Sequence, residues 1–269
     1  DWRYNRIAGL ESTKFLLYHK EPELFNNPPA GLKDQIYNAN TPSVLYNAMI
    51  YPVIPYTIKG AIWYQGESNV RRAEQYLNLF PAMIQDWRSM WNEEFPFYFV
   101  QIAPFGYGNG LSPGLRDVQR KTLAEPSTGM AILMDAGSEP SIHPGNKQVV
   151  GDRLARLALG NDYGQPIVTS GPIYKSHSVE GNVITISFDH AGSGLISKDS
   201  NLTGFEISDT HGIFHAASAR IDGNKVIVSL KKVTSPQAVR YGWQDYFEGT
   251  LFNKEGIPAS SFEEGLPKE

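Results

Sequence analysis

The period of the hydrophobic pattern changes near Gly164, and this change most limits what the chain can fold into. Between Lys59 and Gly160, short apolar runs alternate with longer stretches whose apolar residues recur at three- and four-residue spacings. Such alternation is typical of the strands and helices of a parallel sheet. Beyond Gly164, apolar residues recur at every second position in short runs, as in antiparallel strands. The sequence therefore predicts an α/β region followed by an all-β domain.

The α/β region is expected to alternate strands with helices. The predicted strands are the apolar runs at residues 60–65, 97–102 and 130–134, and the predicted helices lie at residues 70–91, 115–124 and 149–158. Pro81 stands inside the first helical pattern, where a proline predicts a kink or a restart. We place this region at residues 41–163 and leave residues 1–40 unassigned, apart from a loop at residues 26–29.

The segment 164–269 is expected to form an antiparallel β-sandwich. Two clusters of turn residues, at 180–182 (EGN) and 222–224 (DGN), separate alternating segments in the way that hairpin connections do. Helical patterns are missing from this part of the sequence. Several short strands with regular turn signals are typical of a small sandwich.

Composition excludes several classes of protein. Hydrophobic residues make up 41% and charged residues 19% of the 269 residues, which is typical of a folded globular chain. The formal charge of −4 is too small to recruit nucleic acid or an anionic membrane, and no apolar run is long enough to span a bilayer. The sequence holds no cysteine, so thiolate metal sites and cysteine nucleophiles are excluded. We expect a soluble chain whose export signal, if any, has been removed.

Polar loops follow each of the three predicted strands. They cover residues 65–69, 101–110 and 135–144. Ligands of an open parallel sheet bind outside the carboxyl ends of its strands, where these loops should meet. The first loop holds Gln65, Gly66, Glu67, Ser68 and Asn69, and the third brings further groups that can exchange protons.

His143 is the candidate general base of the third loop, which also carries Asp135 and Glu139. The ordinary pKa of histidine lets it take a proton from a hydroxyl at neutral pH and return it later. Its position alone leaves open a second interpretation, in which His143 only orders the loop by hydrogen bonding. The first loop has a similar alternative, in which Ser68 or Asn69 caps the next helix.

The glycine-rich segment 106–110 follows the second strand. No helix with the needed third glycine follows it, so a phosphate-binding loop is disfavoured and a mobile rim of a binding site is favoured. Within this rim, Tyr107 is the candidate for stacking on a sugar ring.

Several separated motifs resemble those of the sialate O-acetylesterase family of SGNH-type serine esterases. They are residues 42–50 (PSVLYNAMI), 63–69 (WYQGESN), 73–76 (AEQY), 142–147 (IHPGNK), 150–155 (VGDRLA) and 253–259 (NKEGIPA). The resemblance covers residues 41–160 most strongly. It implies a partial three-layer SGNH or flavodoxin-like parallel sheet, an O-acetylated sugar as substrate, no cofactor or metal, and a periplasmic or extracellular location.

The resemblance also implies roles for site residues. His143 matches the family's histidine base, and residues 65–67 match the block that lines the active site. In that block Gln65 or Asn69 would donate to the oxyanion, and Glu67 would hold the histidine or the sugar. One oxyanion donor can contribute a hundredfold or more in rate.

The sequence departs from the family pattern at two places. No Gly-Gln-Ser-Asn-type nucleophile motif precedes residue 60, so we expect the nucleophile on an upstream segment or a second chain. Ser68 is the less favoured replacement. The acid usually found shortly before the histidine is replaced by Pro140 and Ser141, so Glu139, Asp135 or a backbone carbonyl would have to orient His143.

The sequence is thus interpreted as the histidine-bearing part of a carbohydrate O-acetylesterase. Two alternatives stay open: a non-catalytic fragment that binds carbohydrate, and an assembly module whose sheet is completed by another chain.

Overall fold

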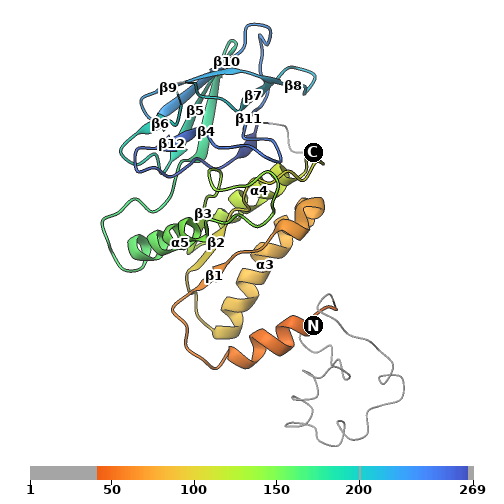
Figure 1. Cartoon of the computed structure of the whole chain (residues 1–269), viewed down its shortest axis with the longest axis vertical. Helices are drawn as coiled ribbons and strands as arrows, with labels where there is room; N and C mark the ends of the chain where they lie inside the picture. Colours follow the sequence, from red (N-terminus) through yellow and green to blue (C-terminus); the bar gives the residue numbers. More distant parts are fainter. Residues whose placement is uncertain (1–40, 200, 266–269) are drawn as a thin grey trace, which may run out of the picture. The chain divides into compact units, whose positions relative to one another are not determined.

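The computed structural model describes residues 41–199 and 201–265 (Figure 1). The chain divides into two compact units, Asp1–Ile58 with Ser89–Glu93, and Lys59–Arg88 with Glu94–Glu269. Residues 1–40, including the loop expected at 26–29, lie outside the described residues. The α/β and β-rich parts share the second unit, so the boundary near residue 163 stays a prediction.

The described part of the first unit is largely helical. A π-helical segment η2 (Tyr46–Ile50) runs directly into the 3-10 turn η3 (Tyr51–Val53). The last residues of α3 (Ala73–Trp91) also fall in this unit, where Trp91 Nε1 donates to the Tyr56 carbonyl oxygen at 3.0 Å. This bond joins the two sequence segments of the unit.

The second unit begins with the parallel sheet that the sequence predicts. Its strands β1 (Ala61–Trp63), β2 (Phe97–Val100) and β3 (Thr128–Ala131) lie in the order β1-β2-β3. The register pairs Ala61 with Phe97 and Phe97 with Thr128. The paired strands β2 and β3 end before the runs from which they were predicted. Residues 101–102 and 132–134 are buried, but they lie beyond the paired strands.

Helices cover both faces of this sheet (Figure 1). Successive side chains of β2 point to opposite faces. Phe97 and Phe99 face α3, where the Phe80 ring lies 6.1 and 5.1 Å from theirs between centroids. Tyr98 and Val100 belong to the opposite core, which they share with α5 (Lys147–Asn161). A central strand buried on both faces explains the unbroken apolar run from which it was predicted.

Helix α3 continues through Pro81, so the predicted restart there is wrong. Proline removes only one backbone donor, and the buried Phe80 and Ile84 on either side anchor the helix to the sheet. The chain enters α3 through the 3-10 segment η4 (Glu67–Arg72). The second predicted helix is α4 (Ser112–Lys121), extended by η5 (Thr122–Ala124), and it starts earlier than expected because Pro113 suits a first turn.

The β-rich part consists of antiparallel sheets. One has the order β4-β5-β10-β9, a second β13-β11-β7-β8, and β12 pairs with β6. The strands are β4 (Ile173–Glu180), β5 (Val183–Asp189), β6 (Leu195–Ser197), β7 (Phe205–Ser208), β8 (Phe214–Ala216), β9 (Ser218–Asp222), β10 (Lys225–Ser229), β11 (Val239–Tyr241), β12 (Leu251–Asn253) and β13 (Phe262–Glu264). Both predicted hairpin turns are confirmed, with Gly181 and Gly223 at φ of +59° and +60°.

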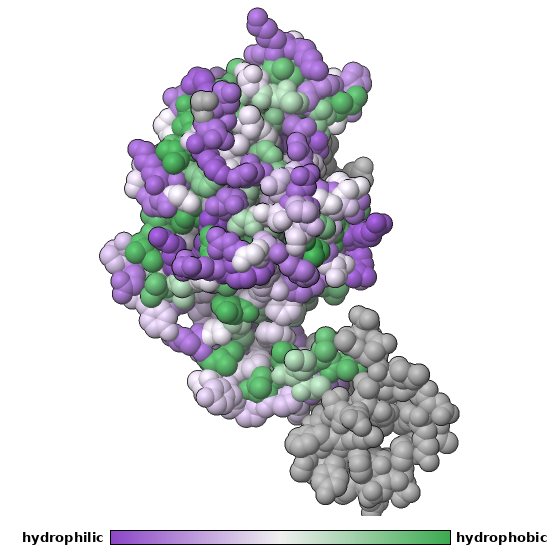
Figure 2. Space-filling view, viewed as in Figure 1, coloured by the Kyte–Doolittle hydropathy of each residue, from purple (hydrophilic) through white to green (hydrophobic). Residues whose placement is uncertain are grey.

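The two four-stranded sheets share one hydrophobic core. Ile186 and Val226 come from the first sheet, and Phe205, Tyr241 and Phe262 from the second. Each of these side chains is at most 1% exposed, which accounts for the period of two in the sequence. On the outside, the face seen in Figure 2 mixes hydrophilic and hydrophobic residues over these sheets.

A buried arginine of α4 ties the β-rich part to the parallel sheet. The guanidinium of Arg116 donates to Ser261 Oγ at 3.2 Å, to the carbonyl oxygens of Gly242 and Asp245 at 3.1 and 3.3 Å, and to that of Gln244. Burial lowers the pKa of Arg116 to about 10. The many carbonyl acceptors compensate for the lost hydration of this cation. Among the described residues, no helix combines the length and the apolar character needed to cross a bilayer.

Candidate active site

The turn after β1 is shaped by a glycine. Gly66 has φ +157° and ψ −25°, and a Cβ atom there would lie 3.0 Å from Ile102 Cγ2 and 3.1 Å from Gln119 Nε2. Both the backbone conformation and the space therefore require glycine. The Gly66 carbonyl accepts from Asn69 N at 2.7 Å, which starts η4. Gly66 precedes η4, and no side chain forms a hydrogen bond that caps the start of η4. Ser68 and Asn69 lie inside η4, so their interpretation as a helix cap is wrong for this segment.

Gln119 of α4 joins the exits of β1 and β2. Its Nε2 donates to the carbonyl oxygens of Val100 at 3.1 Å and Gln65 at 3.4 Å, and its Oε1 accepts from Ile102 N at 2.9 Å. The Gln65 side chain is held by Tyr76, whose hydroxyl donates to Gln65 Oε1 at 3.1 Å. With this oxygen engaged, Gln65 keeps two amide N–H donors.

A pocket of about 350 Å³ lies where the loops after β1 and β3 meet. It is lined by Tyr64, Glu67, Ser68, Ile142, His143 and Lys147. Of the three loops expected to meet, those after β1 and β3 both line this pocket and bring Glu67, Ser68 and His143 to one surface, whereas the loop after β2 contributes no lining residue. Gln65, Asn69 and Tyr107 do not line this pocket.

Tyr64 and Lys147 are pocket residues that the sequence reasoning missed as functional groups. Lys147 Nζ lies 4.7 Å from the centroid of the Tyr64 ring, a cation–π contact. Burial, and secondly the charge of Glu67, raises the pKa of Tyr64 to about 12. The phenol is therefore a proton-bearing donor at neutral pH. Its hydroxyl oxygen is buried and has no hydrogen-bond partner among the described residues. Tyr64 and Lys147 both lie inside motifs that resemble the family, and this position was the sequence signal that could have identified them as site residues.

His143 is exposed at the mouth of this pocket, and Ser141 orders its backbone. His143 N donates to Ser141 Oγ at 3.2 Å, and that hydroxyl donates in turn to the His143 carbonyl at 3.2 Å. Within residues 41–199 and 201–265, no carboxylate forms a hydrogen bond with the imidazole.

The two acids proposed to orient His143 have other contacts. Asp135 forms a bidentate pair with Arg153, at 2.6 Å from Nη1 and 2.7 Å from Nη2. Arg153 is buried in α5, so this pair fastens the loop after β3 to that helix. Glu139 is exposed, and its backbone carbonyl accepts from Gly106 N at 3.1 Å. Their roles as orienting acids stay predictions without a supporting contact.

Ser68 and Asn69 face an arginine of the next turn. Arg72 Nη2 donates to Asn69 Oδ1 at 3.2 Å and to the Ser68 carbonyl at 3.4 Å. The Asn69 amide oxygen is thereby engaged within η4, whereas its two N–H donors stay available. Ser68 is exposed and lines the pocket, which Asn69 does not.

Tyr107 is half-buried rather than displayed on the surface. Its ring packs edge-on against Phe105, with centroids 4.7 Å apart. Burial and then the charge of Glu67 raise the pKa of the Tyr107 phenol. The following loop is held by Asp245, whose Oδ2 accepts from Asn109 N at 2.9 Å and Gly110 N at 2.7 Å.

Comparison with known proteins identifies relatives of this site. Residues 33–158 match the family described as carbohydrate esterase, sialic acid-specific acetylesterase. A crystal structure titled as a novel carbohydrate acetylesterase from Xanthomonas citri aligns with a TM-score of 0.80 and 41% identity. The chain is related to the sialate O-acetylesterases. The alignment with that structure covers 83% of this chain and 54% of the other.

Curated sialate O-acetylesterases give the same result. The mouse protein is 31% identical over 229 residues, which is 75% of this chain and 42% of that protein. The human protein is 34% identical over 163 residues, or 52% of this chain and 31% of that protein. The resemblance inferred from the motifs is therefore confirmed, and the chain spans less than half the length of these sialate O-acetylesterases.

Proposed function

We propose that this chain is the histidine-bearing part of a carbohydrate O-acetylesterase that acts on sialate-type acetyl esters. The observation that carries this proposal is the pocket shared by Glu67, Ser68, His143 and Lys147 at the carboxyl ends of parallel strands. The pocket lies within the segment that matches the acetylesterase family. The printed names of the relatives support the reaction class, since all describe acetyl ester hydrolysis.

In the proposed mechanism, a serine oxygen attacks the carbonyl carbon of the acetyl group. His143 takes the serine proton and then passes it to the sugar oxygen, which leaves as an alcohol. Water attacks the remaining acetyl-serine and gives its proton to His143, and collapse releases acetate and returns that proton to the serine. The exposed position of His143 lets solvent and substrate reach the imidazole.

Neutral N–H and O–H donors near the pocket would stabilise the oxyanion. The Gln65 amide keeps its two N–H donors, and the high pKa of Tyr64 keeps its phenol protonated. Preorganised donors of this kind lower the barrier because they need no reorganisation as charge develops. Glu67 is the carboxylate that shares the pocket with His143, and we assign it to holding the imidazole or the sugar.

We place the nucleophile on a segment outside these residues. Among residues 41–199 and 201–265, β1 has β2 as its single neighbour in the sheet, and Ile62 in its middle is 72% exposed. An open edge presents unpaired backbone N–H and C=O groups to which a further strand can pair. A parallel strand added beside β1 would end next to the pocket. Ser68 is the second candidate, favoured by its exposed place in the same pocket as His143.

The test measures acetate release from p-nitrophenyl acetate and from 9-O-acetylated sialic acid. It compares this chain alone with the chain joined to its presumptive upstream segment, each with His143→Ala and Ser68→Ala versions. We expect activity only in the extended protein, and a loss of roughly 10⁴- to 10⁶-fold with His143→Ala. His211→Ala is the matched control, since His211 is 82% exposed and lies in the antiparallel part.

Two results would contradict this proposal. Activity of the isolated chain that disappears with Ser68→Ala would move the nucleophile to Ser68. An extended protein that binds acetylated sugar without releasing acetate would instead favour the non-catalytic carbohydrate-binding fragment.

A further inference from the structure

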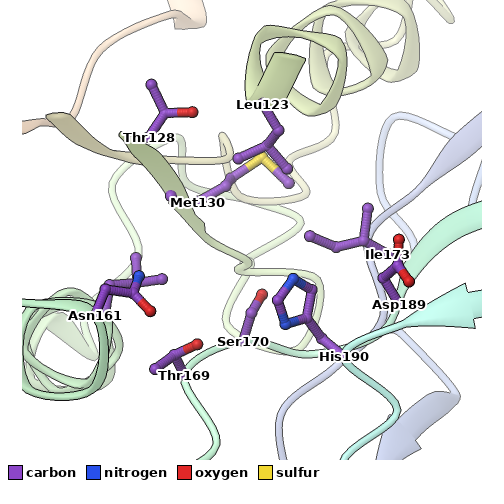
Figure 3. Close-up of a pocket in the computed structure, with 11 residues that line it drawn as sticks. Leu123, Thr128, Met130, Asn161, Thr169, Ser170, Ile173, Asp189 and His190 are labelled. Atoms are coloured by element: carbon purple, nitrogen blue, oxygen red, sulfur yellow. The ribbon is translucent and has the colours of Figure 1, made fainter. Parts of the chain in front are cut away.

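A second cavity lies at the other end of the parallel sheet, between β3, α5 and the first antiparallel sheet (Figure 3). Its volume is about 260 Å³. Thr128, Gly129 and Met130, the first residues of β3, form one wall. His143 follows the carboxyl end of the same strand. The two cavities have no lining residue in common. This cavity is therefore distinct from the candidate active site.

Ser170 contributes to this cavity a buried hydroxyl that has no hydrogen-bond partner among the described residues. The residue is 4% exposed, and its Oγ forms no hydrogen bond among the described residues. In Figure 3 the hydroxyl points into the cavity, toward Met130. A buried hydroxyl without a hydrogen bond destabilises the folded state. A ligand that bonds to this oxygen would remove that penalty.

His190 stands beside Ser170 in a strained backbone conformation. Its φ is +57°, in the left-handed region that residues other than glycine rarely adopt. The buried amide of Asn253 fixes both residues, since its Nδ2 donates to the carbonyl oxygens of Ser170 at 3.0 Å and His190 at 3.3 Å. Asn253 Oδ1 accepts from Ile257 N at 2.9 Å, which locks the amide itself. Strain maintained by such a network is typical of binding sites.

The lining of the cavity indicates the chemical class of its ligand. Asp189 is its acidic group and is paired with Lys175, 2.7 Å away. The lining includes neither lysine nor arginine, so it offers no permanent cation to an anionic ligand. The remaining polar groups are the imidazole of His190, three hydroxyls and an amide, and the apolar ones are aliphatic or thioether side chains. These are Thr128, Asn161, Thr169 and Ser170, with Leu123, Met130, Leu157 and Ile173.

Hydroxyls and amides beside an aliphatic wall match a sugar ring, which has hydroxyls at its edge and C–H groups on its faces. Thr128 Oγ1 already donates to the Glu125 carbonyl at 2.7 Å, so it is left to accept from a ligand hydroxyl. Ser170 Oγ can both donate and accept. We propose that this cavity binds one neutral sugar ring, through hydrogen bonds to Ser170 and His190. Such binding needs no nucleophile, so it does not depend on the proposed esterase activity.

The proposal is tested by titrating the ¹⁵N-labelled chain with D-galactose and with N-acetyl-D-glucosamine, followed by two-dimensional NMR. We expect saturable shifts at the amides of residues 169, 170 and 190, and weaker or no shifts there with the anionic N-acetylneuraminic acid. Ser170→Ala should weaken binding about tenfold, the loss of one hydrogen bond. Its fold should persist, because the Oγ has no protein partner to lose.

Matched variants separate binding from folding. Ser208 also has a buried hydroxyl without a partner among the described residues, but it lies in β7 away from the cavity, so Ser208→Ala should leave sugar binding unchanged. His190→Gly should abolish binding while keeping or raising stability, because glycine tolerates φ +57°. Asn92→Gly, at φ +51°, is its control.

The absence of saturable shifts up to the solubility limit of both sugars would overturn the proposal. So would shifts confined to the residues around His143, equal binding of N-acetylneuraminic acid in this cavity, or an affinity unchanged by both Ser170→Ala and His190→Gly.

Discussion

The two ends of the parallel sheet hold different kinds of cavity. At the carboxyl end, His143, Glu67 and Lys147 bring three titratable groups to an open pocket. At the amino end, the buried hydroxyl of Ser170 lies opposite apolar side chains, and the one carboxylate is already paired. The first arrangement suits proton transfer and charge stabilisation, and the second suits recognition of a neutral ligand.

The difference follows from the way each end is built. The carboxyl end consists of loops, which can carry polar side chains without disturbing the ladder. The cavity at the amino end is instead lined by β3 and α5 together with Ile173 and Asp189 of the first antiparallel sheet. One end is therefore open to a large substrate, whereas the other is a confined space between two packed parts of one unit.

The largest expected effect in stability comes from breaking the ion pair behind the carboxyl-end pocket. Asp135→Asn keeps the shape of the side chain but leaves the buried Arg153 charge uncompensated. We expect the free energy of unfolding to fall by about 3 kcal/mol, measured by urea denaturation. The control is Asp189→Asn at the amino end. Its pair with Lys175 is more than half exposed, so its loss should cost less than about 1 kcal/mol.

The same variant separates two roles for Asp135. If Asp135 only fastens the loop to α5, acetate release by the active preparation should fall by less than about tenfold. A loss near 10⁴-fold with little loss of stability would make Asp135 the acid that orients His143.

The sequence was sufficient to predict the parallel sheet and the hairpins, because both depend on local periodicity. The strand ends were less predictable. Ile102 and residues 132–134 are as apolar as the ladders they follow, and apolar character reports burial rather than pairing. The helix restart predicted at Pro81 was wrong for a related reason. The burial of Phe80 and Ile84 stabilises the continuous helix by more than the one missing backbone N–H donor costs.

The candidate site was predictable only where loops leave strands in sequence order. That rule brought Ser68 and His143 together, although 75 residues separate them in the numbering. It did not predict that Lys147 lies over Tyr64, or that Asp135 is used by Arg153. Those contacts depend on how side chains from α5 pack onto the loops, and no local pattern encodes them.

A middle-sized effect is expected from the glycine that shapes the carboxyl-end pocket. Gly66→Ala places a methyl group 3.0 Å from Ile102 Cγ2 in a conformation that alanine disfavours. We expect unfolding to become easier by about 1 to 3 kcal/mol, with lower esterase activity and unchanged sugar binding at the amino end.

Gly151→Ala in α5 is the matched control. A Cβ there meets no atom within 4 Å, so alanine should stabilise the helix by about 0.5 to 1 kcal/mol. Equal effects of the two substitutions would show that Gly66 is not required for the turn.

The smallest expected effect concerns pH and tests the electrostatics of the carboxyl-end pocket. Because the pKa of Tyr64 is about 12 in the folded chain, above the ordinary tyrosine value of 10.0, the folded state holds this proton more tightly than the unfolded state. The associated stability is present below pH 10 and is lost as pH rises toward 12. Tyr64→Phe should make this decline shallower, as measured by urea denaturation at pH 9 and pH 11. Tyr163→Phe is the control, since Tyr163 is 60% exposed. An identical decline in Tyr64→Phe and the parent chain would show that burial and Glu67 do not hold the Tyr64 phenol in its protonated form.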